Sequence, residues 1–159
     1  MAVCAAAAPQ FRWTPAANLH LTIRFLGQVE KAVAEGIVDR LAGHDLRAFD
    51  VRLGELGTFK RGRLVRVVWL GLATGGGEVG ALAAAVEAET VAAGLAPEAR
   101  RFSAHLTLAR ARPRDGAPLP ELSPPPSLSP WRADELILFQ SRLGRAGSVY
   151  EPLRSLRLG

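Results

Sequence analysis

The chain has 159 residues, of which 48% are hydrophobic, and this is enough apolar material for one globular domain. Its apolar stretches fall far short of the roughly 18 residues that a membrane-spanning helix requires, and its alanine-rich start lacks the basic head of a secretory signal. With one cysteine, Cys4, an internal disulfide is excluded, and we expect a cytoplasmic protein that uses no metal ion.

The formal net charge is +5, and 18 of the 20 basic residues are arginine. Arginine grips phosphate through two parallel hydrogen bonds, so this balance favours a phosphate-bearing partner. A GC-rich genome explains an arginine bias equally well. Charge alone therefore leaves both explanations open.

The predicted elements are short strands with two helices between them. A strand is expected through the segment HLTIRFLG at 20–27, and helical spacing of apolar residues follows over 29–42. The further expected elements are a strand at 49–59, a basic turn at 60–63, a strand at 64–72, a helix at 79–94, a strand through 101–112, a proline-rich loop at 113–130, and strands at 135–143 and 149–158.

Two nearly identical tetrads lie 85 residues apart, HLTI at 20–23 and HLTL at 105–108. The chain has three histidines, and two of them belong to these tetrads. One HxT strand alone more often carries a core or edge histidine than a catalytic one, so the duplication is what favours a functional pair. The third histidine, His44, is assigned no role.

Strand alternation gives each tetrad a polar face and an apolar face. His20 and Thr22 share one face of the first strand, and His105 and Thr107 share one face of the second. Two imidazoles brought together can act as acid and base on one substrate, and the two hydroxyls beside them can hold an anion. We therefore predict that these four residues form one catalytic site.

Other side chains near the tetrads are candidates for substrate binding. Arg24 is expected on the polar face, about 13 Å along the strand from the histidine, where it would meet a neighbouring phosphate or simply face solvent. Phe59, beside the basic turn, is a candidate for stacking a base. Arg110 is expected on the face opposite the second histidine unless a bulge intervenes, and Trp69 is expected in the core.

The second half of the chain has a strand, a helix and a motif strand in an order that the first half shows only in part. Only 19 residues precede His20, and residues 2–10 are mostly alanine, which is a poor strand former. We therefore expect the first lobe to be one strand short and its motif strand to be the less protected of the two.

The tetrads and their surroundings resemble the 2H phosphoesterase superfamily, and within it the RNA 2′,3′-cyclic phosphodiesterases, once called 2′-5′ RNA ligases. The resemblance covers most of the chain in the family's order, and the HxTx pair is its specific part. The segments that carry it are FRWTPAANLHLTIRFLG (11–27), RLVRVVWLGL (63–72), FSAHLTLAR (102–110) and LILFQSRLGRAGSVYEPL (136–153). The strand and helix that open the family's sequences have no counterpart here.

The resemblance implies an α+β fold, with a single domain over 1–159 made of two pseudo-symmetric lobes. Each lobe would hold an antiparallel sheet with helices on its outer side, and the two sheets would face a central cleft. Each lobe would present one His/Thr pair to that cleft.

The implied activity is hydrolysis of RNA 2′,3′-cyclic phosphate ends to 2′-phosphomonoesters, with no cofactor and with 2′-5′ RNA ligase side activity. By resemblance, His20 is the proton donor and His105 the proton acceptor, while Thr22 and Thr107 bind the phosphate. The expected partners are RNA ends that bear the cyclic phosphate, tRNA fragments among them. A monomer with no membrane contact is expected.

Two other functions stay open at this point. A 2H enzyme that acts on a small cyclic nucleotide or on an ADP-ribose cyclic phosphate would carry the same tetrads. A catalytically weakened module that binds RNA ends would follow if the incomplete first lobe compromised the cleft, although all four polar side chains of the motifs are present.

Overall fold

The computed structural model describes residues 2–122, 128–144 and 147–159, and these divide into two compact units. Each unit is assembled from three separate stretches of the chain. Unit 1 takes Met1–Thr22, Arg52–Thr74 and Ala104–Pro130, and unit 2 takes Ile23–Val51, Gly75–Ser103 and Trp131–Gly159. The chain therefore changes unit directly after the first HxT motif and again just before the second.

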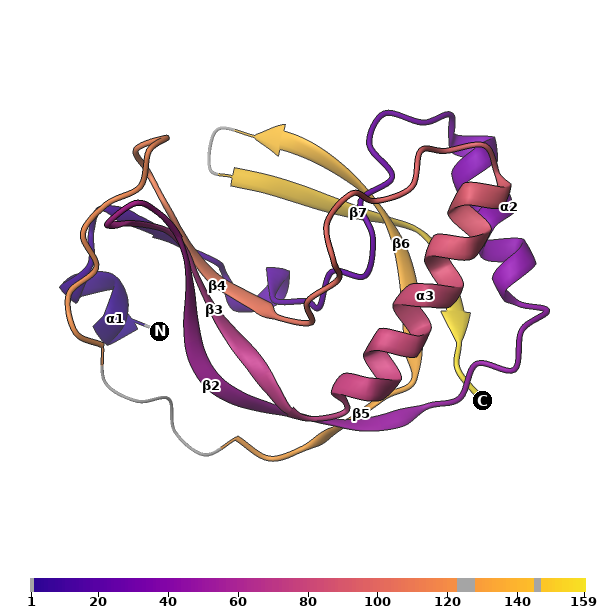
Figure 1. The fold of residues 1–159 in the computed structure, drawn as a ribbon, viewed down its shortest axis with the longest axis horizontal. Coiled ribbons are helices and arrows are strands. Elements are labelled where there is room, and N and C mark those ends of the chain that lie inside the picture. Colours follow the sequence, from indigo (N-terminus) through magenta and orange to yellow (C-terminus); the bar gives the residue numbers. More distant parts are fainter. Residues whose placement is uncertain (1, 123–127, 145–146) are drawn as a thin grey trace. The chain divides into compact units, whose positions relative to one another are not determined.

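Unit 1 is built on an antiparallel sheet in which β4 lies between β1 and β3, and β3 lies between β4 and β2 (Figure 1). The β2–β3 hairpin closes through a two-residue turn, where Gly62 has a φ of 59° that suits such a turn. The elements are α1 (Ala2–Ala7), β1 (Phe11–Trp13), the 3-10 helix η1 (Ala16–Asn18), most of β2 (Phe49–Arg61), β3 (Leu64–Thr74) and β4 (Leu106–Ala111).

The core of unit 1 covers one face of this sheet. Phe11, Val68 and Ala109 are at most 1% exposed, and they come from the three neighbouring strands β1, β3 and β4. Burial of each large apolar side chain contributes about 1.5–3 kcal/mol. Because the apolar side chains gather on this face, the opposite face of the same strands carries the polar groups.

Unit 2 holds the two long helices, α2 (Lys31–Leu41) and α3 (Gly76–Ala92), which lie side by side (Figure 1). It also holds the hairpin of β6 (Glu135–Gly144) and β7 (Gly147–Arg157), while β5 (Trp131–Ala133) pairs with the first residues of β2. The buried core of this unit is formed by Ile37, Leu41, Leu82, Val86 and Leu158.

These elements confirm the α+β class. Every strand pair in the described part of the chain is antiparallel, and no helix connects two parallel strands there. The helices predicted from apolar spacing correspond to α2 and α3, and the four predicted strands outside the motifs correspond to β2, β3, β6 and β7. Parts of the predicted proline-rich loop and of the last hairpin turn, at 123–127 and 145–146, lie outside the described residues. In the described part of the chain, no helix has the length and apolar character needed to cross a membrane.

Two expectations about the motifs were wrong. The first tetrad is not a regular strand: in 20–27 only Leu21 makes a sheet contact, as an isolated bridge, and the second motif strand starts at Leu106. Both motifs also belong to unit 1, rather than one to each lobe. The internal repeat in the sequence suggested two lobes with one motif each, because it does not reveal which segments pair in space.

We expect the two motifs to differ in hydrogen exchange. β4 is paired on both sides, with β1 and β3, whereas the first motif is attached at one bridge. Amides of residues 22–26 should therefore exchange faster than those of 106–109, and mass spectrometry of peptic fragments would measure this. Equal protection of the two segments would mean that the first motif is held by contacts other than this bridge.

A second prediction concerns Glu89 of α3, which joins the end of α2. Its carboxylate accepts from Arg40 Nε at 2.7 Å and lies 2.9 Å from His44 Nε2. The hydrogen bonds from Arg40 and His44 hold the pKa of Glu89 below its ordinary value of 4.5. A carboxyl with a lowered pKa stabilises the fold above its unfolded pKa, and this stabilisation is lost as the pH falls through the folded pKa.

Glu89→Gln should therefore lower the melting temperature at pH 7, and the difference from the parent should shrink as the pH drops below 4.5. Thermal unfolding followed by circular dichroism between pH 3 and 7 measures both, in steps of about one unit. Glu135→Gln on the β6–β7 hairpin is a control for the loss of one surface carboxylate. A difference that persisted unchanged to low pH would show that the carboxylate charge is not what stabilises this contact.

Candidate active site

The first motif follows a tight return of the chain after β1. Thr14 N–H donates to the Leu108 carbonyl at 2.8 Å, and η1 then turns the chain. His20 is half-buried, and its Nδ1 lies 2.8 Å from the Asn18 carbonyl oxygen. Because a carbonyl oxygen only accepts, Nδ1 carries a hydrogen, and Nε2 is the nitrogen at which His20 gains or loses a proton. The hydrogen bond therefore sets both the orientation of the ring and its reactive atom.

A single antiparallel bridge, between Leu21 and Leu106, joins the two motifs. Residues on either side of an antiparallel bridge also face each other, with direct neighbours ~4.5–5.5 Å apart at Cβ and diagonal neighbours ~7–8 Å apart. The facing pairs are His20 with Thr107 and Thr22 with His105. That these four residues form one site stays a prediction, and the register of the bridge supports it.

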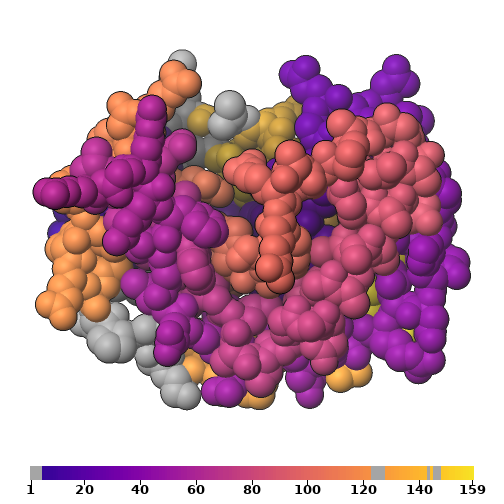
Figure 2. All heavy atoms as spheres, in the orientation of Figure 1, coloured from indigo at the N-terminus to yellow at the C-terminus, as the bar shows by residue number. Residues whose placement is uncertain are grey.

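Two aromatic rings lie against His105. The ring centroid of Phe59 is 5.0 Å from that of His105, in an edge-on arrangement at 87°, and that of Trp69 is 6.0 Å away at 60°. Phe59 is 40% exposed, so part of its ring is open to a ligand. The β2–β3 turn that follows Phe59 projects from the surface (purple in Figure 2), and its basic side chains face solvent.

A register shift between β3 and β4 determines which side chains of β4 lie on the same face as Thr107. Val68 pairs with Ala109, but Trp69 pairs with Thr107, so Leu108 is an extra residue in β4. Such a bulge interrupts strand alternation. Leu108 and Ala109 both lie on the core side, and Arg110 returns to the face of Thr107. Without a bulge, strand alternation would place Arg110 on the core face. The sequence prediction allowed for a bulge at this point, and the structure contains one.

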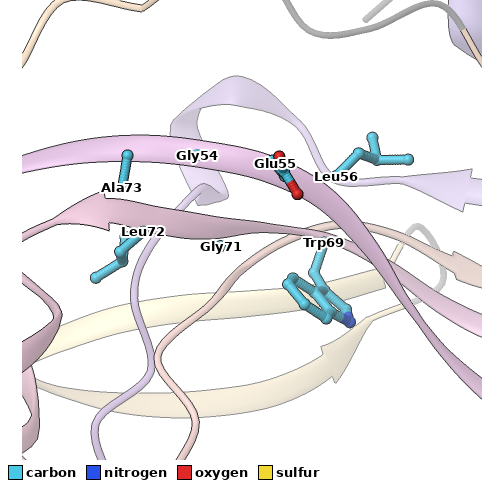
Figure 3. A pocket seen from close by; sticks show the side chains of 7 residues that line it. All are labelled: Gly54, Glu55, Leu56, Trp69, Gly71, Leu72 and Ala73. Carbon is cyan, nitrogen blue, oxygen red and sulfur yellow. The ribbon is translucent and has the colours of Figure 1, made fainter.

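Trp69 was expected in the core, and the structure gives a half-buried side chain that lies outside the core cluster of unit 1. Its partner in the sheet is Gly57, and a Cβ there would lie 2.2 Å from the indole, so only a residue without a side chain leaves space for the ring. Figure 3 shows the indole on one side of the hairpin and Leu56 on the other. Residues of both strands line a pocket of about 470 Å³ at this place. Val68 and Leu70 are buried, so strand alternation predicts that Trp69 between them lies on the opposite face of the sheet.

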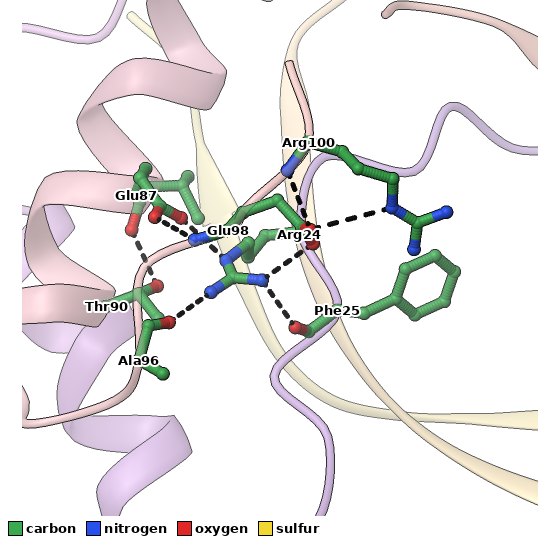
Figure 4. Close-up of polar contacts among 8 residues, drawn as sticks. Arg24, Phe25, Glu87, Thr90, Ala96, Glu98 and Arg100 are labelled. Atoms are coloured by element: carbon green, nitrogen blue, oxygen red, sulfur yellow. Dashed lines mark hydrogen bonds and ion pairs between the residues drawn. The ribbon is translucent and has the colours of Figure 1, made fainter. Parts of the chain in front are cut away.

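Arg24 belongs to unit 2, where its guanidinium group is held by several polar contacts (Figure 4). Its Nε forms an ion pair with Glu87 at 2.6 Å, and its Nη1 forms one with Glu98 at 3.1 Å. Nη2 donates to the Ala96 carbonyl at 2.7 Å, and the side chain is only 12% exposed. All three guanidinium nitrogens are thus engaged, and a substrate-binding role for Arg24 stays a prediction.

The ion pairs of Arg24 connect the chain after the first motif with the chain before the second. Glu98 lies on the loop that leads from α3 to the second motif, and its N–H donates to the Glu87 carboxylate at 2.7 Å. The arginine therefore keeps two carboxylates together that would otherwise repel each other. Within the described residues, no group of three or more His, Cys, Asp or Glu side chains is arranged to hold a metal ion.

The sequence is similar to proteins that work on phosphodiesters. The family model described as LigT like Phosphoesterase matches residues 4–69 and 71–150. A protein of Aeropyrum pernix named RNA 2′,3′-cyclic phosphodiesterase is 34% identical over 145 residues, which cover 88% of this chain and 82% of the relative. A protein of Escherichia coli strain K12 with the same name is 31% identical over 138 residues, 86% and 74% of the two chains.

Solved structures agree with this similarity. Crystalline E. coli LigT complexed with 3′-AMP has a TM-score of 0.80 and 26% identity, and the match covers 95% of this chain and 83% of that one. A protein of Thermus thermophilus has a TM-score of 0.77 and 26% identity, with 99% and 92% covered. Both matches extend over nearly the whole of the present chain.

The contact between Gly57 and Trp69 leads to a prediction. In Gly57→Ala the new methyl would overlap the indole, so the ring must move, and we expect a loss of roughly 1–3 kcal/mol in unfolding free energy. Gly71→Ala is the matched control, because its Cβ would meet the same ring at 3.4 Å and require only a small adjustment. Urea unfolding and near-ultraviolet circular dichroism of the tryptophans measure the effect. Equal behaviour of the two variants would refute this account of the Trp69 site.

Proposed function

Since the chain belongs to the LigT-like phosphoesterases, we propose that it hydrolyses RNA 2′,3′-cyclic phosphate ends to 2′-phosphomonoesters. The relatives from A. pernix and E. coli are named for this activity, and LigT binds 3′-AMP, a nucleotide with a phosphate on the ribose. The observation that supports the proposal is the bridge between Leu21 and Leu106, which joins the two HxT motifs in one antiparallel register.

Two histidines would carry the proton transfers. Hydrolysis joins a water oxygen to phosphorus and breaks the bond from phosphorus to the 3′ oxygen. Neutral His105 accepts the proton of the attacking water, and protonated His20 gives its Nε2 proton to the departing 3′ oxygen. The assignment of donor and acceptor rests on the family resemblance, and such acid–base assistance contributes about 10²–10⁴-fold in rate.

The threonines would stabilise the phosphate as its charge grows. Thr22 and Thr107 can each donate a hydrogen bond to a non-bridging oxygen, and donors aimed at developing charge are worth most where water is excluded. Together with protonated His20 they offset the phosphate's charge, so the reaction as proposed requires no metal ion.

Phe59 would recognise the base next to the cyclic phosphate. Its ring touches His105 at a centroid distance of 5.0 Å and is partly exposed, which suits stacking beside the reacting group. Stacking of a base on an aromatic side chain is worth about 1–3 kcal/mol. We also propose that Arg24 contacts the substrate, and to do so its guanidinium group would have to exchange one of its contacts with Glu87, Glu98 or the Ala96 carbonyl.

The same site would also support a ligase side activity. If the 5′-hydroxyl of a second RNA attacks phosphorus in place of water, the 3′ oxygen leaves and a 2′-5′ linkage remains. We further propose that the protein is a cytoplasmic monomer, and that tRNA fragments with cyclic ends are among its substrates.

The catalytic proposal predicts the outcome of four substitutions. His20→Ala and His105→Ala should each lower kcat on an oligonucleotide with a 2′,3′-cyclic phosphate end by about a hundredfold or more, the scale of a lost acid or base. Thr22→Ala and Thr107→Ala should cost less, and a chelator should leave the rate unchanged. His44→Ala is the matched control, because this histidine is engaged with Glu89 in unit 2 and should keep full activity. A folded His105→Ala variant with near-parental activity would sink the two-histidine mechanism.

A further inference from the structure

Trp69 of β3 lies beside both polar residues of the second motif. It pairs directly with Thr107, and His105, two residues earlier in the chain, is its diagonal neighbour. Diagonal neighbours of an antiparallel pair lie about 7–8 Å apart, which is within reach of an aromatic side chain. The indole and imidazole centroids are 6.0 Å apart, a distance typical of packed aromatic rings.

His105 lies just outside the regular strand, because β4 begins one residue later at Leu106. The orientation of its imidazole therefore depends more on the groups packed against the ring than on strand pairing. Of the two aromatic rings against it, Phe59 is 40% exposed, whereas Trp69 is half-buried. Trp69 is thus the firmer support, and an indole has only two side-chain torsions that must be fixed.

The sheet accommodates this tryptophan in ways that weaken the fold. Gly57 must be a glycine to leave space for the indole, although a glycine inside a strand is unfavourable. The Nε1 of Trp69 is buried and has no hydrogen-bond partner among the described residues, which is unfavourable as well. A leucine at position 69 would require neither. Local features that oppose stability are expected where a side chain serves a functional site.

We propose that Trp69 is a positioning residue for His105, whose imidazole it holds in the orientation that accepts the proton of the attacking water. This inference rests on the proposed function and adds to it a residue that acts without touching the substrate. Displacement of a reacting group by about 1 Å can lower the rate by about 10²-fold. The loss of Trp69 should therefore affect the chemical step and leave substrate binding nearly intact.

The first test measures steady-state kinetics on an oligonucleotide with a 2′,3′-cyclic phosphate end. In Trp69→Leu, kcat should fall about tenfold or more, while KM stays within about twofold of the parent's value. Trp69→Phe keeps an aromatic plane and should recover part of the loss. Trp13→Leu is the matched control, because Trp13 packs against the core of unit 1. It should lower the melting temperature and leave kcat unchanged where the variant is folded.

A double-mutant cycle tests whether Trp69 acts through the histidine. His105→Ala/Trp69→Leu should be no slower than His105→Ala alone, because a support has no effect once the group it holds is gone. Gly57→Ala provides a second variant that displaces the indole without removing it. Its kcat should fall, whereas that of Gly71→Ala should stay close to the parent's value.

The outcomes separate the two proposals. If the parent does not hydrolyse the oligonucleotide, the proposed function fails. The positioning role alone is overturned if the parent is active and a folded Trp69→Leu variant keeps its kcat, raises only KM, or loses the same factor in the His105→Ala background. If Trp69→Leu does not fold, an unchanged kcat in both Trp69→Phe and Gly57→Ala overturns it.

Discussion

The antiparallel bridge between Leu21 and Leu106 determines the relation of the two HxT motifs, which are distant in the chain and otherwise unconnected by a strand. Leu106 is buried and Leu21 is half-buried, and strand alternation places their polar neighbours on the opposite side. A slip of one residue at this point would turn each histidine to the core and each leucine to solvent. Apolar burial beneath the site therefore specifies the arrangement of the polar groups above it.

The two faces of the unit 1 sheet have different roles. One face packs in the core, and the other carries the predicted site residues. Phe11, Val68 and Ala109 on the core face are almost completely buried. The other face carries aromatic, polar and basic side chains that contribute little to packing, and one glycine, Gly57, which makes space for Trp69. Because of the bulge at Leu108, Arg110 lies on the same face as Thr107, so the polar face of β4 continues past the bulge.

Much of this organisation could be predicted from the sequence. Helical spacing indicated α2 and α3, and duplication of the tetrads led to the prediction that their histidines and threonines form one site. What could not be predicted depends on pairing between distant segments. The bulge arises where β3 and β4 meet, and the partners of Arg24 lie on α3 and on the loop after it. Local periodicity contains neither, so the face of Arg110 depended on a bulge that the sequence could only leave open.

The reciprocal pairing of histidine with threonine has a consequence for how a substrate is oriented. In the proposed site, antiparallel pairing about the bridge would relate the four motif residues by an approximate local twofold axis, so a small tetrahedral anion would find nearly the same surroundings in either of two orientations. An RNA strand has a direction, and the twofold arrangement cannot read it. Polarity must come from groups that break the symmetry, and these gather around one motif: Phe59 and Trp69 flank His105, while the Asn18 carbonyl is the partner of His20.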